Sequence, residues 1–201
     1  KLIFIANPNN PTGTLLTDNE IYNFLSKVPT RIPIVLDQAY YEYLDTRDQA
    51  MDWLNVFDNL IITRTFSKAY GLAGLRVGYS VSRPDIADYI NRVRAPFNVN
   101  HSAQIAAIAA LNDVNYLQES VRSNRQGIKQ LEECFKSLNL NYIKSSANFI
   151  AVEFDNALET YEKLLKEGVI VRPIEIPNFL RISVGTAEEN IYLIQALKKI
   201  L

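Results

Sequence analysis

The sequence has 201 residues, of which 48% are hydrophobic and 21% charged, and its formal net charge at pH 7 is −1. This composition is ordinary for a globular protein and supplies enough apolar residues for a core. The small net charge argues against a nucleic-acid surface or an anionic membrane as a partner. No apolar run reaches the length of a membrane span. Cys134, the single cysteine, excludes an internal disulfide, so we expect a reducing, cytoplasmic setting.

The start of the chain is unusual for a complete protein. It opens directly on the apolar run 2–5, and its one methionine is Met51. The order of basic, apolar and small residues that marks a signal peptide is missing. We therefore expect the chain to be part of a longer polypeptide.

The sequence up to residue 100 alternates apolar runs with helical segments. Thr17 followed by Glu20 forms the capping box of a helix that should end near Lys27. Pro84 stands at a favourable first-turn position of another helix. Short apolar runs predict four strands, at 2–6, 32–36, 60–65 and 77–81. Strands alternating with helices predict an α/β layered sheet with mostly parallel strands.

Beyond residue 100 the pattern becomes α+β. Thr186 is a suitable cap for the last helix, and residues 188–190 should be its solvated first turn. The expected elements are helices at 103–111 and 114–138, a strand at 148–154, a helix at 156–167, strands at 169–172 and 180–184, and a helix at 187–200. We predict two domains, 1–113 and 114–201.

Candidate functional side chains occur in three segments near predicted strand ends, where open α/β sheets bind ligands. The first segment contains Asn10 in a turn rich in proline and asparagine. Its amide could donate to a ligand oxygen, although alone the segment is better explained as a tight turn. The second segment places Asp37 at a strand end, where it could pair with a protonated ring nitrogen or cap a helix. Tyr40 could reach the same ligand.

The third segment contains Lys68 just after a predicted strand. A lysine amine becomes a nucleophile where its surroundings lower its pKa. Thr65, Ser67 and Arg76 are donors suited to a phosphate group. Taken alone, Lys68 would be an exposed surface lysine. Together and in this order, the three segments favour one functional site over three unrelated turns.

The sequence resembles the class I and II aminotransferases of fold type I, which use pyridoxal 5′-phosphate (PLP). Within this family it is most similar to the histidinol-phosphate branch. The resemblance covers essentially the whole chain and implies the C-terminal half of a large α/β/α domain followed by a small α+β domain. It depends on NPNNPTG at 7–13, DQAYYEY at 37–43, TFSKAYGLAGLRVGY at 65–79, PFNVN at 96–100, Val171-Arg172 and LRISVGT at 180–186.

The resemblance implies a role for each candidate residue. Lys68 would hold PLP covalently through its amine and act as the catalytic base. Asp37 would pair with the ring nitrogen, while Asn10 and Tyr40 would hydrogen-bond the ring oxygen. The other implied contacts are the cofactor phosphate with Thr65, Ser67 and Arg76, and the anionic end of the substrate with Arg181 and, more weakly, Arg172.

The implied enzyme is a transaminase that moves an amino group between histidinol phosphate and 2-oxoglutarate in histidine biosynthesis, as a homodimer without a metal. One departure from the family pattern is Gln38, where the family often has glutamate; no mechanistic cost is evident. The family also uses cofactor contacts from chain preceding residue 1, so this chain alone could lack a working site.

Several other functions stay open. The same motifs occur in aromatic aminotransferases, in decarboxylases of a phosphorylated amino acid and in acyl-transferring synthases, all of which use PLP. A truncated, non-catalytic module that contributes to folding or dimerisation is a further alternative. A dinucleotide-binding Rossmann unit is disfavoured, because no strand–GxGxxG–helix segment is present.

Overall fold

The structure is a computed structural model that describes residues 1–45 and 48–201. The chain forms two compact units, one made of residues 1–8 and 15–118 and the other of residues 9–14 and 119–201. The division falls within helix α5 (Val114–Ser137). The loop at 9–14 belongs to the second unit although the strand before it belongs to the first.

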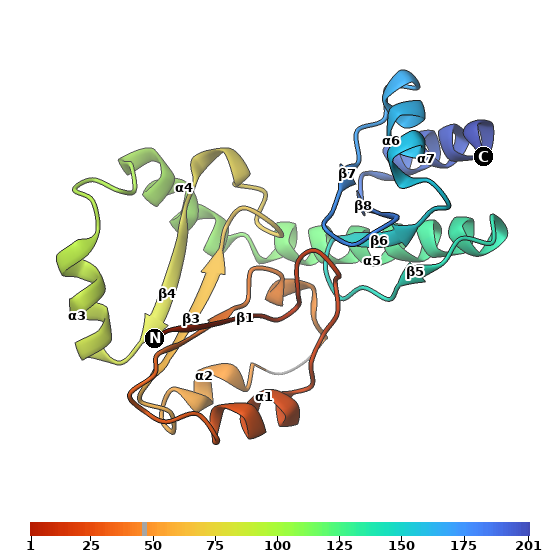
Figure 1. Cartoon of the computed structure of the whole chain (residues 1–201). Coiled ribbons are helices and arrows are strands. Elements are labelled where there is room, and N and C mark those ends of the chain that lie inside the picture. Colours follow the sequence, from red (N-terminus) through yellow and green to blue (C-terminus); the bar gives the residue numbers. More distant parts are fainter. Residues whose placement is uncertain (46–47) are drawn as a thin grey trace. The chain divides into compact units, whose positions relative to one another are not determined.

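The first unit contains a four-stranded sheet in the order β1-β2-β3-β4 (Figure 1). Parallel pairing joins the first three strands, whereas β4 runs antiparallel to β3. The register aligns Ala6, Asp37 and Thr63, so the carboxyl ends of the parallel strands meet at one edge. The strands are β1 (Ile3–Ala6), β2 (Ile34–Asp37), β3 (Leu60–Thr65) and β4 (Gly78–Ser82).

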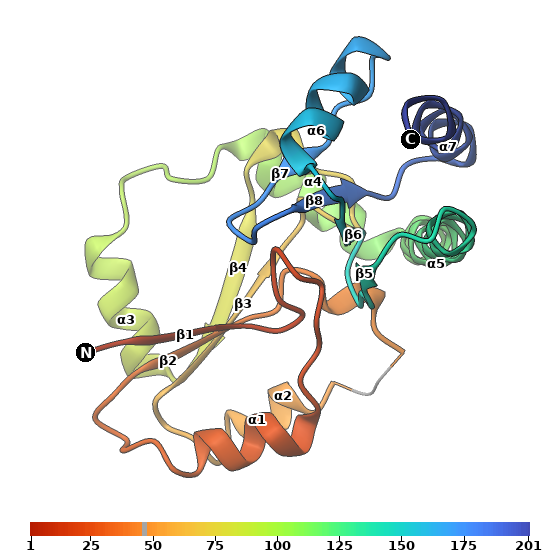
Figure 2. The same cartoon turned by 45° about the vertical axis from the view of Figure 1, so that its right-hand side comes forward.

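Two helices, α1 (Asp18–Leu25) and α2 (Ala50–Trp53), cover the same face of this sheet (Figures 1 and 2). The predicted capping box begins α1: Thr17 accepts from the Glu20 N–H, and the Glu20 side chain accepts from the Thr17 N–H. The apolar core between helices and sheet consists of Ile21, Leu25, Ile34, Leu36, Ala50, Trp53, Leu60 and Ile62.

The same unit contains α3 (Pro84–Val93) and α4 (His101–Asn112). Pro84 occupies the first turn of α3, as predicted, and the Asn100 side chain caps α4 by accepting from the Ala103 N–H. Single-turn 3₁₀ helices lie at Tyr41–Tyr43 and Ala73–Leu75. A small core between α4 and the β3–β4 loop consists of Phe66, Val77, Ala103 and Ala107.

The second unit contains an antiparallel sheet in the order β5-β6-β8-β7. The apolar core packs this sheet against α5, α6 and α7; its bulkiest members include Leu131, Phe135, Ile150 and Leu180. The new elements are β5 (Tyr142–Ile143), β6 (Phe149–Glu153), α6 (Ala157–Lys166), β7 (Arg172–Pro173), β8 (Phe179–Ser183) and α7 (Ala187–Ile200). No helix in residues 1–45 and 48–201 is long and apolar enough to cross a membrane.

The expectation of a wholly solvated first turn in α7 was wrong for Asn190. Its side chain is 2% exposed and forms two hydrogen bonds with Gly185, accepting from the N–H at 3.0 Å and donating to the carbonyl at 3.3 Å. These bonds fasten the loop that precedes the helix, so a buried asparagine is satisfied there.

Candidate active site

Asp37 is the last residue of β2, and its side chain is fixed by the turn that follows. Its Oδ1 accepts a hydrogen bond of 3.0 Å from the N–H of Ala39. Its backbone carbonyl accepts from the N–H of Asn7 at 2.9 Å, which continues the sheet ladder beyond β1. The carboxylate is therefore held at the carboxyl edge of the sheet, where open α/β sheets bind ligands.

Tyr40 and Lys68 connect the first unit's two candidate segments. The Tyr40 side chain is buried, with 4% of the residue exposed. The Nζ atom of Lys68 lies 5.4 Å from the centre of the Tyr40 ring, within the range of a cation–π contact. The lysine amine and the segment that begins at Asp37 thus lie at the same edge of the sheet.

The loop between β3 and β4 groups donors around Ser67. The N–H of Ser67 donates to Oγ1 of Thr65 at 3.0 Å. Nη1 of Arg76 donates to Oγ of Ser67 at 3.3 Å and to the carbonyl of Ala73 at 2.9 Å. Two hydroxyls and a guanidinium group are therefore close to one another, which is a donor set suited to a phosphate.

Backbone contacts hold this loop close to the sheet. The N–H of Phe66 donates to the carbonyl of Val77 at 3.1 Å, next to the paired residues Thr65 and Gly78. A Cβ atom on Gly78 would lie 2.7 Å from the carbonyl oxygen of Arg64. Glycine is needed at this position because a side chain would push the two strands apart.

In the second unit, the loop at 9–14 meets the β7–β8 pair. Nη1 of Arg181 donates to the side-chain oxygen of Asn10 at 2.6 Å. Arg172 is paired with Arg181 across the two strands, and both arginines and Asn10 line a cavity of about 680 Å³. Nε of Arg181 is buried and has no hydrogen-bond partner within residues 1–45 and 48–201. The cavity therefore holds two cationic side chains suited to an anionic ligand.

The structure thus arranges the predicted site residues in two groups. The first unit brings together Asp37, Tyr40, Thr65, Ser67, Lys68 and Arg76. The second unit brings together Asn10, Arg172 and Arg181. The roles assigned to these residues stay predictions.

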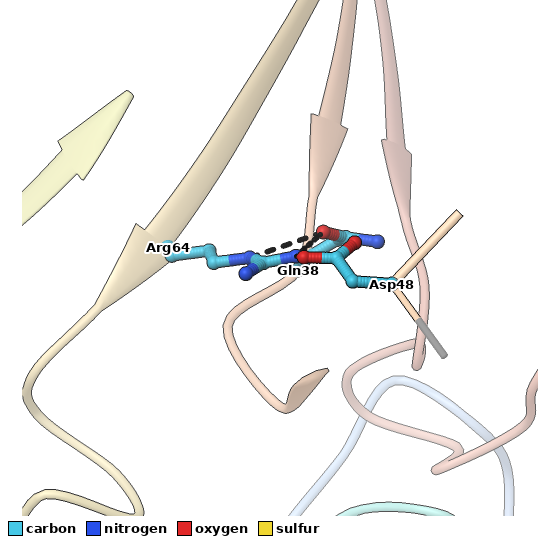
Figure 3. A network of polar contacts seen from close by, with 3 residues as sticks. All are labelled: Gln38, Asp48 and Arg64. Carbon is cyan, nitrogen blue, oxygen red and sulfur yellow. Dashed lines mark hydrogen bonds and ion pairs between the residues drawn. The ribbon is translucent and has the colours of Figure 1, made fainter. Parts of the chain in front are cut away.

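Sequence reasoning missed a polar network next to the first group, shown in Figure 3. The Arg64 guanidinium donates to Oε1 of Gln38 from Nε at 3.2 Å and from Nη2 at 2.7 Å. Its Nη2 also lies 2.7 Å from Oδ2 of Asp48. The Arg64 side chain is 8% exposed. The signal in the sequence was a charged residue within the otherwise apolar and hydroxyl-bearing run of β3.

Glu42 lies beside this network, and the surroundings of its side chain disfavour the charged form of its carboxyl. Burial raises the pKa of its carboxyl, while Arg64 lowers that pKa and Asp48 raises it further. Its Oε2 has no hydrogen-bond partner within the part of the chain that the structure describes. Burial also raises the pKa of the Tyr41 and Tyr70 hydroxyls.

Residues 1–197 match the family model described as aminotransferase class I and II. The chain belongs to this family. The expected resemblance is confirmed, and so is the expected fold class, a mostly parallel sheet together with a small antiparallel α+β part.

Among curated relatives, a histidinol-phosphate aminotransferase from Methylobacillus flagellatus is 51% identical over 99% of this chain and 55% of its own length. Histidinol-phosphate aminotransferase 1 from Idiomarina loihiensis is 50% identical over 100% of this chain and 56% of its own length. The chain therefore spans about half the length of these relatives.

Among solved structures, the histidinol-phosphate aminotransferase from Sinorhizobium meliloti in complex with pyridoxal-5′-phosphate is similar, with a TM-score of 0.88 and 31% identity. The alignment covers 98% of this chain and 56% of that one.

Proposed function

We propose that the protein is a PLP-dependent histidinol-phosphate aminotransferase, and that this chain carries its catalytic lysine. Relatives at 50% and 51% identity over nearly the whole chain have that activity in their names. The observation that carries the proposal is the grouping at the carboxyl edge of the first sheet. There the Lys68 amine lies beside Tyr40, within the unit that also holds the Asp37 carboxylate.

The residues of the first unit fit PLP by their chemistry. A carboxylate at Asp37 suits a protonated pyridine nitrogen, and the amine of Lys68 suits an aldehyde. The hydroxyls of Thr65 and Ser67 and the guanidinium of Arg76 suit a phosphate dianion, and Ser67 already accepts from Arg76. An aldehyde, a basic ring and a phosphate are the three groups that PLP presents.

When bound, PLP supplies an electron sink for the bonds at the carbon that carries the substrate amine. In the proposed mechanism, Asp37 keeps the proton on the ring nitrogen, which strengthens that sink. Tyr40 and Asn10 donate hydrogen bonds to the ring oxygen. Lys68 would hold the cofactor through Nζ and, once free, would serve as the general acid–base for the proton at the substrate carbon.

Arg181 and Arg172 are proposed to bind the anionic end of each substrate. Histidinol phosphate and 2-oxoglutarate both bear an anion remote from the reacting carbon, so one cationic cavity can serve both half-reactions. Alternation of two substrates at one site implies ping-pong kinetics. We further propose that the whole protein is a homodimer, that it acts in the cytoplasm and that its partners are these small molecules.

The test is a substrate comparison. The protein is mixed with PLP, 2-oxoglutarate and one amino donor, and glutamate is measured by mass spectrometry. We expect glutamate with histidinol phosphate and none with the Lys68→Ala variant. Faster turnover of phenylalanine or tyrosine would favour an aromatic aminotransferase, and carbon dioxide from a phosphorylated amino acid would favour a decarboxylase. No turnover of any donor would favour a non-catalytic module and contradict the proposal.

A further inference from the structure

At the carboxyl ends of β2 and β3, the two faces of the sheet bear different sets of polar side chains. Side chains alternate along a strand, so Asp37 and Gln38 point to opposite faces, as do Thr65 and Arg64. The register pairs Asp37 with Thr63, and the N–H of Gln38 donates to the Thr63 carbonyl at 2.9 Å. Asp37 and Thr65 therefore share one face, while Gln38 and Arg64 share the opposite face.

On that opposite face, Arg64 joins the two strand ends. Its two bonds to Oε1 of Gln38, at 3.2 and 2.7 Å, run from β3 to the residue that follows β2. The pair with Asp48 at 2.7 Å and the Tyr41 ring, whose centre lies 3.9 Å from Cζ, fix the plane of the guanidinium group. The planar guanidinium group of Arg64 is held in one orientation by these hydrogen bonds and by the Tyr41 ring. The ammonium group of a lysine could not reproduce this arrangement.

The neutral side chain at position 38 suits the charges around it. Arg64 is one cation, and Asp48 and Glu42 supply two carboxyls close to it. A glutamate at 38 would bring a third carboxyl to the same guanidinium in a largely buried place. Glutamine provides the acceptor oxygen without the charge, so the bond between the strands forms without further like-charge repulsion.

We infer that Arg64, together with Gln38, is a positioning residue of the site, which sets the placement of Asp37 relative to the loop that bears Ser67 and Lys68. This inference rests on the proposed function. Arg64 acts through the backbone: it fixes the distance between the ends of β2 and β3, and the ligand-facing side chains follow. Preorganised placement of this kind is what binding and catalytic groups require.

The first measurement is amide hydrogen exchange in Gln38→Met, Gln38→Glu and Arg64→Lys. Gln38→Met removes the acceptor but keeps the Arg64–Asp48 pair, whereas Gln38→Glu keeps an acceptor oxygen. The matched control is Arg83→Lys, because Arg83 also pairs with an aspartate at 2.7 Å but is 49% exposed. The reporter amides are those whose bonds define the strand ends, namely the N–H groups of Asn7, Gln38, Ala39 and Ser67.

We expect these four amide protons to exchange faster in Gln38→Met and in Arg64→Lys than in the wild type. The expected increase is on the order of tenfold, which is the scale of one lost charge-assisted hydrogen bond. The amide of Ile34, at the other end of β2, donates to the carbonyl of Asn59 and should keep its protection. All amides should keep their protection in Arg83→Lys. Gln38→Glu should lie between Gln38→Met and the wild type, because it keeps the acceptor oxygen but adds a third carboxyl. Unchanged strand-end amides in Gln38→Met, or an equal change at Ile34, would overturn the inference.

The second measurement separates this inference from the proposed function. PLP affinity and the pH dependence of the visible absorption of bound PLP are compared among the same variants. Weaker PLP binding and a displaced pH profile in Gln38→Met, partly recovered in Gln38→Glu, support the inference. Unchanged values in Gln38→Met overturn it. If the wild type binds no PLP, the proposed function fails, and the exchange of the four amides alone decides the role of Arg64 in placing the strand ends.

Discussion

Arg181 donates a hydrogen bond of 2.6 Å to the side-chain oxygen of Asn10, although the two residues are 171 positions apart in the sequence. A second bond, from the N–H of Ser146 to the carbonyl of Gly13 at 2.8 Å, fastens the same loop within the second unit. Gly13 has a φ of +77°, and a Cβ atom there would lie 2.2 Å from Oγ of Ser145. Glycine therefore allows the close approach that brings Asn10 to the arginine.

The first prediction concerns anion binding at this arginine. Arg181→Gln should weaken the binding of histidinol phosphate by about 10- to 100-fold, because charge-assisted hydrogen bonds contribute about 1.5–3 kcal/mol. Arg172→Gln should weaken it less, since Arg172 is exposed. Titration calorimetry measures both. Arg122→Gln, which removes an exposed ion pair with Glu119 on α5, is the control. Equal affinity in Arg181→Gln and the wild type would exclude this arginine from the substrate site.

The second prediction concerns pH and Glu42. Burial raises the pKa of this carboxyl above its ordinary value of 4.5, so the folded state binds a proton more tightly than the unfolded state. The stability linked to this group is fully present below pH 4.5 and is lost as pH rises through the raised pKa. Glu42→Gln, which is neutral at every pH, should raise the melting temperature at pH 8 and change it little at pH 4.

Circular dichroism melts of the wild type and Glu42→Gln between pH 4 and pH 8 test this sign. Asp52→Gln is a suitable control, because Asp52 is an exposed carboxylate on α2 of the same unit. A Glu42→Gln effect that is largest at pH 4 would show that the folded state stabilises the carboxylate instead.

The third prediction concerns packing around Gly127 in α5. A Cβ atom there would lie 2.3 Å from Cγ1 of Val184 and 2.8 Å from Nδ2 of Asn190. Gly127→Ala should therefore lower the free energy of unfolding by about 1–3 kcal/mol, as overpacking of a core does, despite the better helix propensity of alanine. Gly74→Ala meets nothing within 4 Å and should leave stability almost unchanged. Urea denaturation of both variants measures the free energy of unfolding. A Gly127→Ala variant that is more stable than the wild type would contradict the close packing around Gly127.

Local sequence signals predicted the elements of the fold well. The predicted capping box at Thr17 and the predicted cap at Thr186 are both formed, and the apolar runs became β1, β2, β3 and β4. Because each motif follows a predicted strand end, the sequence indicated that the segments of Asn10, Asp37 and Lys68 could converge on one site. The structure brings the Asp37 and Lys68 segments together within the first unit, whereas Asn10 belongs to the second.

Long-range side-chain contacts could not be predicted from the sequence. No local pattern reveals that Arg64 bonds Gln38, because the pairing depends on which face each residue takes at the strand ends. Asn190 looked like part of a solvated turn, yet its amide satisfies Gly185. The two-residue strand β5 is too short to show a period.

The central claim, that Lys68 is the residue that holds the cofactor, has one direct test. The protein is incubated with PLP, reduced with borohydride, digested and analysed by mass spectrometry. We predict a phosphopyridoxyl group on the peptide that contains Lys68 and its loss in Lys68→Ala, with Lys144→Ala as a control that keeps the group. A group attached to another lysine, or to none, would contradict the account.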